Sequence, residues 1–311
     1  MVERSQFLGV EAILASPRMR ELMQQVRKAA LSAEAVLVVG EPGAGKEIIA
    51  RAVHQYSDRR PGPFVDLNCA AMPRELMASE LFGYERGAVA GASAAKPGLL
   101  ELAHAGSLYL DEIGAMEADI QRKLKRALES GSFHRLGAVR QSRANVRVIA
   151  ATAPSSSQTA VEVELLDRAR TIELVVPPLR ERPEDIEALA GHFLAQQNPE
   201  MRLAADAMMA LYSYQWPGNV RELRNTVLRS ALLAKGPLLH ADDLLFTPRQ
   251  IEAPTTGVTG LEPALIRRAL VDHGGHRQRT ADALGISRWT LARRMRDYGI
   301  AEITAGGRKQ G

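Results

Sequence analysis

Eight residues near the start of the chain have the types and spacing of a phosphate-binding loop. Residues 40–47 read Gly-Glu-Pro-Gly-Ala-Gly-Lys-Glu, the Walker A pattern. Glycines let a backbone wrap closely around phosphates, the amides at a helix start attract the anion, and a lysine adds positive charge at the outer phosphates. We therefore expect nucleotide to be bound by Gly40, Glu41, Pro42, Gly43, Ala44, Gly45, Lys46 and Glu47.

Two carboxylates further along the chain suit the metal and the water of a triphosphate-cleaving site. The apolar residues 107–110 end in Asp111 and Glu112. Glu47 stands where a Ser or Thr hydroxyl usually helps to hold magnesium, so the metal depends more on Asp111. Glu112 suits a base that orients the attacking water. The pattern predicts a bound nucleotide together with Mg²⁺.

The hydrophobic pattern predicts the elements that position these residues. A short apolar run over residues 34–39 ends in glycine, and helical spacing follows over residues 47–55. Further buried-strand candidates are separated by helix-length segments such as residues 120–130; they lie at residues 64–67, 107–110, 146–151 and 171–175. Strands alternating with helices predict an α/β fold with a doubly wound parallel sheet.

The rest of the chain has a different pattern. After Pro177 and Pro178 the strands are expected to stop, and residues 184–235 predict several helices. Residues 247–260 are rich in proline, glycine and threonine and are typical of a linker. We expect four parts: a nucleotide-binding subdomain (residues 1–176), a helical subdomain (177–246), the linker (247–260) and a small all-α domain (261–311).

The last domain carries the basic surplus of the chain. Residues 255–311 hold ten Lys/Arg against five Asp/Glu, a balance of +5, while the whole chain has a net charge of +4. A small basic unit on a near-neutral body is typical of a nucleic-acid-binding module.

A helix-turn-helix is predicted within this basic domain. Residues 279–284 suit a short helix, residues 285–286 a turn, and Ser287 the N-cap of a helix over residues 288–298. Leu291, Met295 and Tyr298 then share one face. The second helix suits the DNA major groove. The residues expected to contact DNA are Arg288, Thr290, Arg293 and Arg294, and Trp289 either packs inside the domain or touches DNA.

Composition excludes several other classes of protein. The 311 residues are 46% hydrophobic, which excludes a largely disordered chain, and no apolar run is long enough to span a bilayer. We therefore expect a cytoplasmic protein without a membrane partner. Cys69 is the only cysteine, so neither an intramolecular disulfide nor a cysteine-based zinc cluster is expected, and Cys69 should pack as a small hydrophobe. His273 and His276 lie close together, but nothing supplies the remaining ligands of a metal site.

Several motifs together resemble one family, the AAA+ activators of sigma-54 RNA polymerase, also called bacterial enhancer-binding proteins. They are GEPGAGKE (40–47), FVDLNCAAMPRELMASELFGYE (64–85), GSLYLDEIG (106–114), VPPLRERPEDI (176–186) and WPGNVRELRN (216–225). The segment LGISRWTLARRMRDYGI (284–300) resembles the Fis-type domain that ends members of this family. The resemblance implies an AAA+ sheet with a helical lid, and a homo-oligomeric ring, expected to be a hexamer, with ATP at its subunit interfaces. It also implies DNA and sigma-54 polymerase as partners, and a Glu after the loop lysine is normal in the family.

The resemblance also implies roles for particular residues. Asn68 matches the residue that senses nucleotide and restrains the catalytic Glu112. Arg221 matches a second sensor that contacts nucleotide from the lid. Arg168 matches a catalytic arginine that reaches the site of the neighbouring subunit. Ile13 and Leu14 are expected to wall the adenine.

The chain departs from the family in the loop that touches sigma-54, Gly-Ala-Phe-Thr-Gly-Ala. Here this sigma-contact loop reads Gly87, Ala88, Val89, Ala90, Gly91 and Ala92. An aromatic ring suited to anchoring a protein contact is replaced by Val89, and a hydroxyl by the methyl group of Ala90. The frame of the loop is retained without its tip.

Two more departures concern catalysis. The first sensor ends in Ala153 where the family has Asn, although Thr152 keeps its hydroxyl. Of two expected arginines that reach the neighbouring subunit, Arg168 is retained and the other is Glu162, with Arg170 a weak substitute. Such an arginine is worth roughly a thousandfold in rate. Together with the altered sigma-contact loop, these changes predict a weakened motor: ATP is still bound, but its hydrolysis and the coupling to sigma-54 are reduced.

Several functional alternatives stay open at this stage. Within the family the protein is an active motor, a regulator in which ATP mainly controls assembly, or a subunit of a mixed ring whose partner supplies the missing groups. A remodelling or loader ATPase of the wider AAA+ group is the alternative from a different class. The family motifs begin close to Met1, so we expect no receiver or small-molecule sensor domain before them, and control by a partner protein or by expression level.

Overall fold

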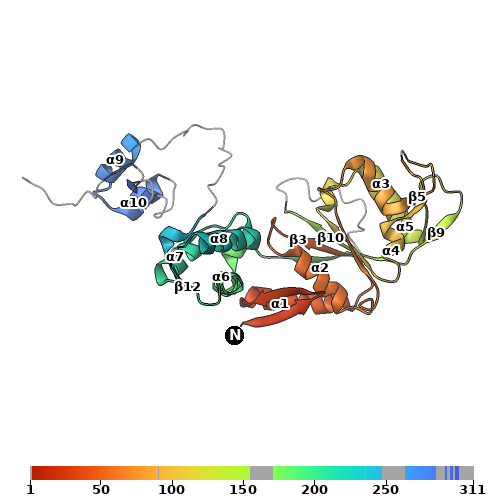
Figure 1. The fold of residues 1–311 in the computed structure, drawn as a ribbon, viewed down its shortest axis with the longest axis horizontal. Coiled ribbons are helices and arrows are strands. Elements are labelled where there is room, and N and C mark those ends of the chain that lie inside the picture. Colours follow the sequence, from red (N-terminus) through yellow and green to blue (C-terminus); the bar gives the residue numbers. More distant parts are fainter. Residues whose placement is uncertain are drawn as a thin grey trace, which may run out of the picture. The chain divides into compact units, whose positions relative to one another are not determined.

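The computed structural model describes residues 2–89, 91–154, 171–234, 236–246, 263–284, 291–292, 295–296 and 298–300. The chain divides into two compact units, residues 1–246 and residues 247–311. Figure 1 shows the elements of each unit, and each is treated by itself below.

A five-stranded parallel sheet forms the centre of the first unit. Its strand order is β11-β3-β10-β7-β4, so the chain crosses over between non-adjacent strands. The strands are β3 (Val36–Val39), β4 (Phe64–Asn68), β7 (Ser107–Asp111), β10 (Arg147–Thr152) and β11 (Ile172–Val175). All five agree with the runs expected from the sequence to within two residues at each end, and the α/β fold class is confirmed.

Helices cover both faces of this sheet, because successive strand residues point to opposite faces. Ile149 and Ala151 of β10 join a buried cluster with helices α1 (Pro17–Ala30) and α2 (Lys46–Gln55). The alternate residues Val148 and Ala150 join a second cluster on the other face. That cluster includes residues of α3 (Arg74–Phe82), α4 (Leu99–Leu102) and α5 (Ala118–Ser130). The sheet therefore has two apolar faces, as doubly wound folds require.

An antiparallel hairpin that the sequence pattern did not indicate precedes the sheet. Strands β1 (Glu3–Phe7) and β2 (Val10–Leu14) pair with Phe7 opposite Val10. The two residues between them, Leu8 and Gly9, have φ of 47° and 83°, the left-handed conformation of a tight two-residue turn. Ile13 and Leu14 at its end are buried.

Two small hairpins lie beyond α3. Strands β5 (Gly83–Tyr84) and β6 (Lys96–Pro97) pair at the base of the sigma-contact loop, residues 87–92. Strands β8 (Ser132–His134) and β9 (Gln141–Arg143) form the second hairpin. A bridge between Tyr84 and Leu136 joins the two.

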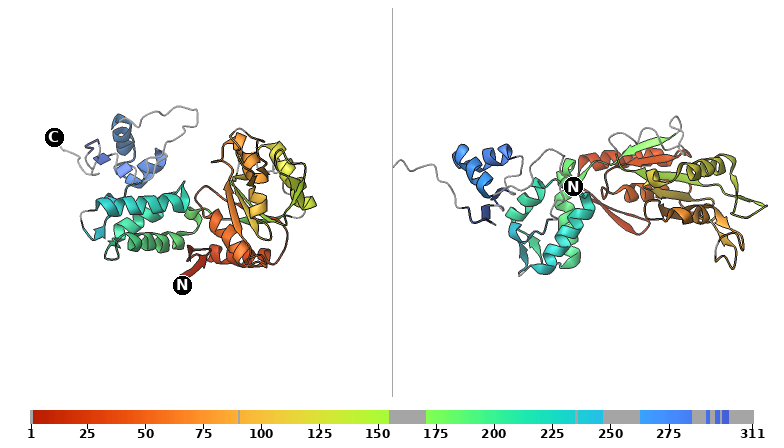
Figure 2. Two further views of the ribbon diagram at one scale, coloured as in Figure 1. Left: turned by 45° about the vertical axis from the view of Figure 1, so that its right-hand side comes forward. Right: turned by 90° about the horizontal axis from the view of Figure 1, so that it is seen from above.

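The described residues between 177 and 246 are mainly helical, and this region is called the lid below. It contains α6 (Pro183–Gln197), α7 (Ala205–Ser213), α8 (Asn219–Leu233) and the short 3-10 helices η2 (Leu179–Glu181) and η3 (Ala241–Asp243). Helices α6 and α8 pack side by side (Figures 1 and 2). The fully buried Trp216 donates from its indole nitrogen to Leu211 O at 2.9 Å and fixes the turn before α8.

The expectation that strands stop after Pro178 is wrong. The two-residue strands β12 (Arg202–Leu203) and β13 (Leu238–Leu239) form a parallel pair within the lid. The backbone N–H groups of residues 202 and 204 require hydrogen-bond partners, and the carbonyl groups of residues 237 and 239 supply them. This pairing is too short to produce a strand pattern in the sequence.

In the second unit, helices α9 (Pro263–Asp272) and α10 (Arg277–Ala283) share a core with later residues. Ile266, Leu270 and Ala281 are buried together with Leu291 and Met295, and Tyr298 packs against them. The face predicted for Leu291, Met295 and Tyr298 is therefore confirmed. The expected DNA-contact residues Arg288, Thr290, Arg293 and Arg294, and also Trp289, lie outside the described residues. Within the described ranges, no helix has the length and apolar character that a membrane crossing needs.

Candidate nucleotide-binding site

The phosphate-binding loop, residues 40–47, connects the end of β3 to the start of α2. Gly43 and Gly45 have φ of 74° and 107°, a conformation that side chains disfavour. In the described part of the chain, the N–H groups of Gly43, Gly45, Lys46 and Glu47 make no protein hydrogen bond. Unpaired amides at a helix start form an anion-binding site, so the local backbone suits a phosphate.

Lys46 brings this loop together with the acidic end of β7. Its side chain is only 6% exposed, and Nζ donates to Gly40 O at 2.9 Å and to Glu112 Oε1 at 3.2 Å. The two residues are 66 positions apart in the chain. The lysine charge is therefore held at the carboxyl ends of the strands, where ligands bind in open α/β sheets.

Asp111 and Glu112 lie at that edge in an unusual backbone conformation. Glu112 has φ of 51° and ψ of 50°, the left-handed region, which costs a non-glycine residue about 1 kcal/mol. Its N–H donates to Asp111 Oδ1 at 3.0 Å. Among the described residues no three His, Cys, Asp or Glu side chains group as a metal site. A Mg²⁺ ion bound at this edge would be held by Asp111 together with phosphate oxygens and water, which is the usual environment of that ion.

Asn68 ends β4 directly opposite Asp111 in the sheet register. Its Oδ1 accepts from the backbone N–H groups of Ala70 at 3.0 Å and Ala71 at 2.9 Å. Within the described residues no hydrogen bond joins Asn68 to Glu112, which is bound by Lys46 instead. The restraint of Glu112 by Asn68 stays a prediction.

Cys69 packs behind these acids, as the sequence predicts. It is buried, and burial, followed by the charges of Asp111 and Glu112, raises the pKa of its thiol to about 12. The thiol therefore stays protonated and unreactive at neutral pH.

The lid meets the phosphate-binding loop at the start of α8. Val220 N donates to Gly43 O at 3.0 Å. A Cβ at position 43 would collide with Gly218 O and lie 3.0 Å from the Cβ of Arg221. The absence of a side chain at Gly43 therefore lets the lid approach, and the backbone of Arg221, the expected second sensor, lies beside the loop.

Polar residues that the sequence analysis did not single out complete this junction. Asn219 is fully buried, and its Nδ2 donates to Glu41 Oε2 at 3.0 Å and to Pro42 O at 3.2 Å. Its Oδ1 accepts from Leu179 N at 2.7 Å. Arg180 donates twice to Glu41, at 2.9 and 2.7 Å, and these hydrogen bonds hold the pKa of the Glu41 carboxyl below its ordinary value. The signal was available in the motifs at residues 176–186 and 216–225, from which the sequence analysis drew a residue role only for Arg221.

The sigma-contact loop is largely self-contained. Gly87 N donates to Ala92 O at 2.9 Å and Ala92 N to Val89 O at 3.1 Å. Val89 is half-buried. A Cβ at Gly137, in the β8–β9 hairpin, would lie 2.7 Å from the Cβ of Ala88, so the hairpin touches the loop. Ala90 lies outside the described residues.

An ion-pair cluster holds the base of this loop. Arg135 donates to both carboxylate oxygens of Glu101 at 2.7 Å and to Glu85 Oε1 at 3.2 Å. The hydrogen bonds from Arg135 hold the pKa of Glu101 below its ordinary value. The loop frame is therefore anchored on the body although its tip side chains are small.

Of the remaining predicted groups, Thr152 and Ala153 lie at the end of β10. Thr152 is buried there, and its Oγ1 lies 3.4 Å from Ala153 O. Glu162, Arg168 and Arg170 fall in residues 155–170, outside the described residues, so the role predicted for Arg168 stays a prediction.

Comparisons with known proteins cover almost the whole chain. Residues 12–171 match the Sigma-54 interaction domain, residues 180–259 the AAA+ ATPase lid domain, and residues 259–298 the bacterial regulatory protein, Fis family. The regulatory protein AtoC of Escherichia coli is 39% identical, over 92% of this chain and 67% of AtoC. The Nif-specific regulatory protein of Klebsiella pneumoniae is 40% identical, over 95% of this chain and 58% of its own length.

A solved structure is similar as well. NtrX from Brucella abortus in complex with ATP has a TM-score of 0.70 at 32% identity, covering 94% of this chain and 70% of NtrX. Against the curated relatives the span is shorter, since this chain covers 48% of the transcriptional activator HyfR of E. coli. The chain therefore spans between about half and two thirds of the length of these three curated relatives.

Proposed function

The chain belongs to the sigma-54 activator family of AAA+ transcription regulators, and on that premise we propose that it is an ATP-binding, DNA-binding regulator with weakened coupling to sigma-54 polymerase. The observation that carries the nucleotide part is the meeting of Lys46 with Glu112 at the carboxyl ends of the strands. The relative NtrX was crystallised with ATP and with ADP, which supports the same ligand class here.

The residues of this site divide the work of nucleotide binding. The unpaired N–H groups of residues 43 and 45–47 bind the phosphates, and Lys46 adds charge once it leaves Glu112. Mg²⁺, held by Asp111, would neutralise developing charge at the phosphates. Glu112, released from the lysine, can accept a proton from water. Arg221 approaches from the lid beside Gly43.

The weakened coupling rests on four positions along one path. Ala153 lacks the sensor amide, and Glu162 replaces an arginine worth roughly a thousandfold in rate. Val89 and Ala90 remove the ring and the hydroxyl of the sigma-contact loop. We expect a homo-oligomeric ring in which ATP is bound tightly and hydrolysed slowly. Of the two arginines that reach the neighbouring subunit in the family, only Arg168 is retained.

A mixed ring is the second candidate. It is favoured because the chain retains one of the two arginines, Arg168, while Glu162 stands at the position of the other. A family member that has both arginines, and Phe and Thr in its sigma-contact loop, would then restore ATPase activity when it is mixed with this protein. The assay mixes the two proteins at fixed total concentration. A rate above the sum of the separate rates supports the mixed ring, and a rate equal to that sum contradicts it.

DNA binding is tested by footprinting, with replacement of two arginines on the predicted recognition helix. We expect discrete protected sites that are lost in Arg293→Ala/Arg294→Ala. Arg267→Ala/Arg268→Ala is the matched control, because it removes two exposed arginines from α9 of the same domain and should leave the footprint intact. Salt-sensitive binding without site preference would contradict the regulator and favour a loader ATPase.

A further inference from the structure

Three consecutive carbonyl groups of the phosphate-binding loop are bound by residues of the lid. Pro42 O accepts from Asn219 Nδ2 at 3.2 Å, Gly43 O from Val220 N at 3.0 Å, and Ala44 O from Arg182 Nη2 at 2.6 Å. In a trans peptide, the C=O of one residue and the N–H of the next point in opposite directions. A carbonyl held toward the lid therefore turns the following N–H away from it.

The third of these contacts uses a buried charge. Arg182 is 3% exposed, and its second guanidinium nitrogen, Nη1, lies 3.4 Å from Asp185 Oδ2. Within the described structure its Nε has no hydrogen-bond partner. Burial lowers the pKa of Arg182, and Asp185 opposes that shift. Burying a charge with an unpaired N–H is unfavourable, so the arginine is poorly explained as a stabiliser of the fold alone.

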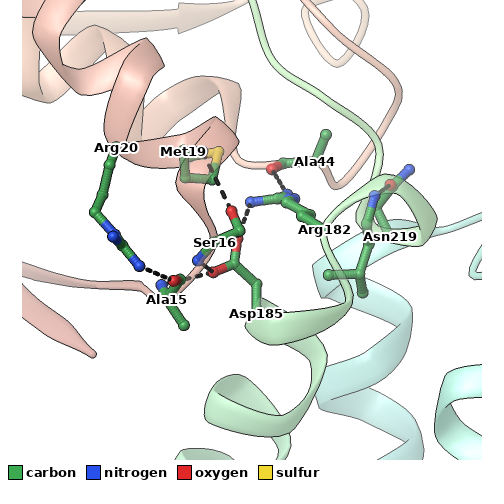
Figure 3. A network of polar contacts seen from close by, with 9 residues as sticks. Ala15, Ser16, Met19, Arg20, Ala44, Arg182, Asp185 and Asn219 are labelled. Atoms are coloured by element: carbon green, nitrogen blue, oxygen red, sulfur yellow. Dashed lines mark hydrogen bonds and ion pairs between the residues drawn. The ribbon is translucent and has the colours of Figure 1, made fainter. Parts of the chain in front are cut away.

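Asp185 connects the same arginine to the N-terminal segment, as Figure 3 shows. The carboxylate is fully buried, and Oδ1 accepts from Ala15 N at 2.7 Å and Ser16 N at 2.8 Å. Oδ2 accepts from Ser16 Oγ at 3.0 Å. With three donors besides Arg182, Asp185 remains satisfied if the arginine is removed. It is thus a fixed support from which Arg182 reaches the loop.

We propose that Arg182, held by Asp185, is a positioning residue that fixes the Ala44 carbonyl and thereby aims the Gly45 N–H at a phosphate of the bound nucleotide. This inference rests on the proposed ATP binding. Arg182 acts through the backbone of the loop, since both its bonded nitrogens are committed to Ala44 and Asp185. It also joins the start of α6 in the lid to the phosphate-binding loop.

Arg147 offers a matched control for a purely structural role. It is 2% exposed and donates to three backbone carbonyls, Ala29 O at 2.7 Å, Ala30 O at 3.0 Å and Glu34 O at 3.1 Å. It begins β10, so it lies at the strand end opposite the phosphate-binding loop. Removal of Arg182 takes the donor from one backbone carbonyl and removal of Arg147 takes it from three, but only Arg182 binds a carbonyl of the phosphate-binding loop.

The test compares Arg182→Met, Arg147→Met and the unaltered protein. Dissociation constants for Mg-ATP and Mg-ADP are measured by calorimetric titration, and the unfolding midpoint is measured on the same samples. Both variants should lower the midpoint. We expect Arg182→Met to raise both dissociation constants about tenfold or more, whereas Arg147→Met stays within about twofold of the unaltered protein.

The outcomes separate this inference from the proposed function. Failure of the unaltered protein to bind ATP would contradict the proposed function. Tight binding by the unaltered protein, with equal dissociation constants for the two variants, would overturn the role of Arg182 alone. If Arg182→Met does not fold, Arg182→Lys decides, because one nitrogen on a differently shaped side chain replaces the two-pronged guanidinium. A dissociation constant at least threefold above that of the unaltered protein supports the role, and an unchanged one overturns it.

Discussion

The phosphate-binding loop and the sigma-contact loop both rely on glycines, but their surroundings differ. At Gly43 a Cβ would collide with Gly218 of the lid, and at Gly40 it would lie 3.0 Å from Val176 Cβ. At Gly87 and Gly91 a Cβ would meet nothing within 4 Å. The first loop is part of a packed junction, whereas the second projects from an anchored base. Side chains can therefore change at the tip of the sigma-contact loop without disturbing the fold.

This difference explains how the two regions can diverge in one chain. Loss of a ring at Val89, which is half-buried and belongs to neither buried cluster of the sheet, leaves no cavity in the core. Loss of a group at the junction would break bonds that join the loop to the lid, as with Asn219. An intact nucleotide-binding body with a weakened output loop is thus a physically consistent combination.

The largest expected effect is the loss of nucleotide binding in Lys46→Ala. The lysine is buried between Gly40 O and Glu112, and its charge is required at the outer phosphates. We expect the dissociation constant for ATP to rise about a hundredfold or more. A titration with a fluorescent ATP analogue measures it, with Arg4→Ala, an exposed surface residue, as the control. Unchanged affinity would show that nucleotide binds elsewhere.

The next effect contrasts the two loops directly through one substitution, glycine to alanine. Gly43→Ala should lower the free energy of unfolding of the first unit by about 2 kcal/mol or more, because left-handed strain adds to the collision with Gly218. Gly87→Ala has the strain alone and should cost about 1 kcal/mol. Denaturant unfolding measures both. Equal losses would mean that the junction is not packed as described.

Restoration of the loop tip tests whether the sigma-contact loop limits output. Val89→Phe with Ala90→Thr should make open-complex formation by sigma-54 polymerase detectable where the unaltered protein gives none, since the ring restores a protein contact. ATP affinity should not change, because among the described residues no backbone hydrogen bond joins the sigma-contact loop to the phosphate-binding loop. If activation stays absent, Glu162 and Ala153 limit the motor, and Glu162→Arg is the next variant.

The smallest expected effect is a pH dependence of stability in the nucleotide-binding body. Burial holds the pKa of His54 below its ordinary value of 6.5, with a further lowering from the charge of Arg147 that a backbone hydrogen bond at Gly62 opposes. The unfolded chain therefore binds the proton more readily, and the His54 contribution is complete above pH 6.5 and declines as the pH falls.

The His54 contribution should be less than about 1.4 kcal/mol per pH unit, because one proton is involved. Unfolding curves between pH 5 and about pH 8 measure it. His54→Gln should flatten this dependence, whereas His134→Gln, at an exposed position in the β8–β9 hairpin beside the sigma-contact loop, should not. An unchanged slope in His54→Gln would contradict the assignment.

Much of the fold could be predicted because its signals are local. The five sheet strands are short apolar runs, and the shared face of Leu291, Met295 and Tyr298 follows from helical spacing. The β1–β2 hairpin was missed because its strands carry mixed polar residues such as Glu3, Arg4 and Glu11. The lid pair β12–β13 is too short to leave a pattern.

The polar contacts of the site could be predicted only in part. Lys46, Asp111 and Glu112 lie in motifs with their own chemistry, and the structure brings Lys46 and Glu112 together. Asn219 bonds to Glu41 across 178 positions of the chain, and Arg182 bonds to Ala44 across 138. No spacing rule connects residues so far apart, so these contacts become visible only when the lid is placed against the sheet.

The central claim, an intact nucleotide site with a weakened motor, is tested most directly by the ATP turnover rate per bound nucleotide. It is measured against protein concentration, alone and with sigma-54 polymerase. We predict saturable ATP binding with slow turnover at every concentration and no open complexes from the protein alone. Turnover at the ordinary rate of the family, with open-complex formation by the protein alone, would contradict the account.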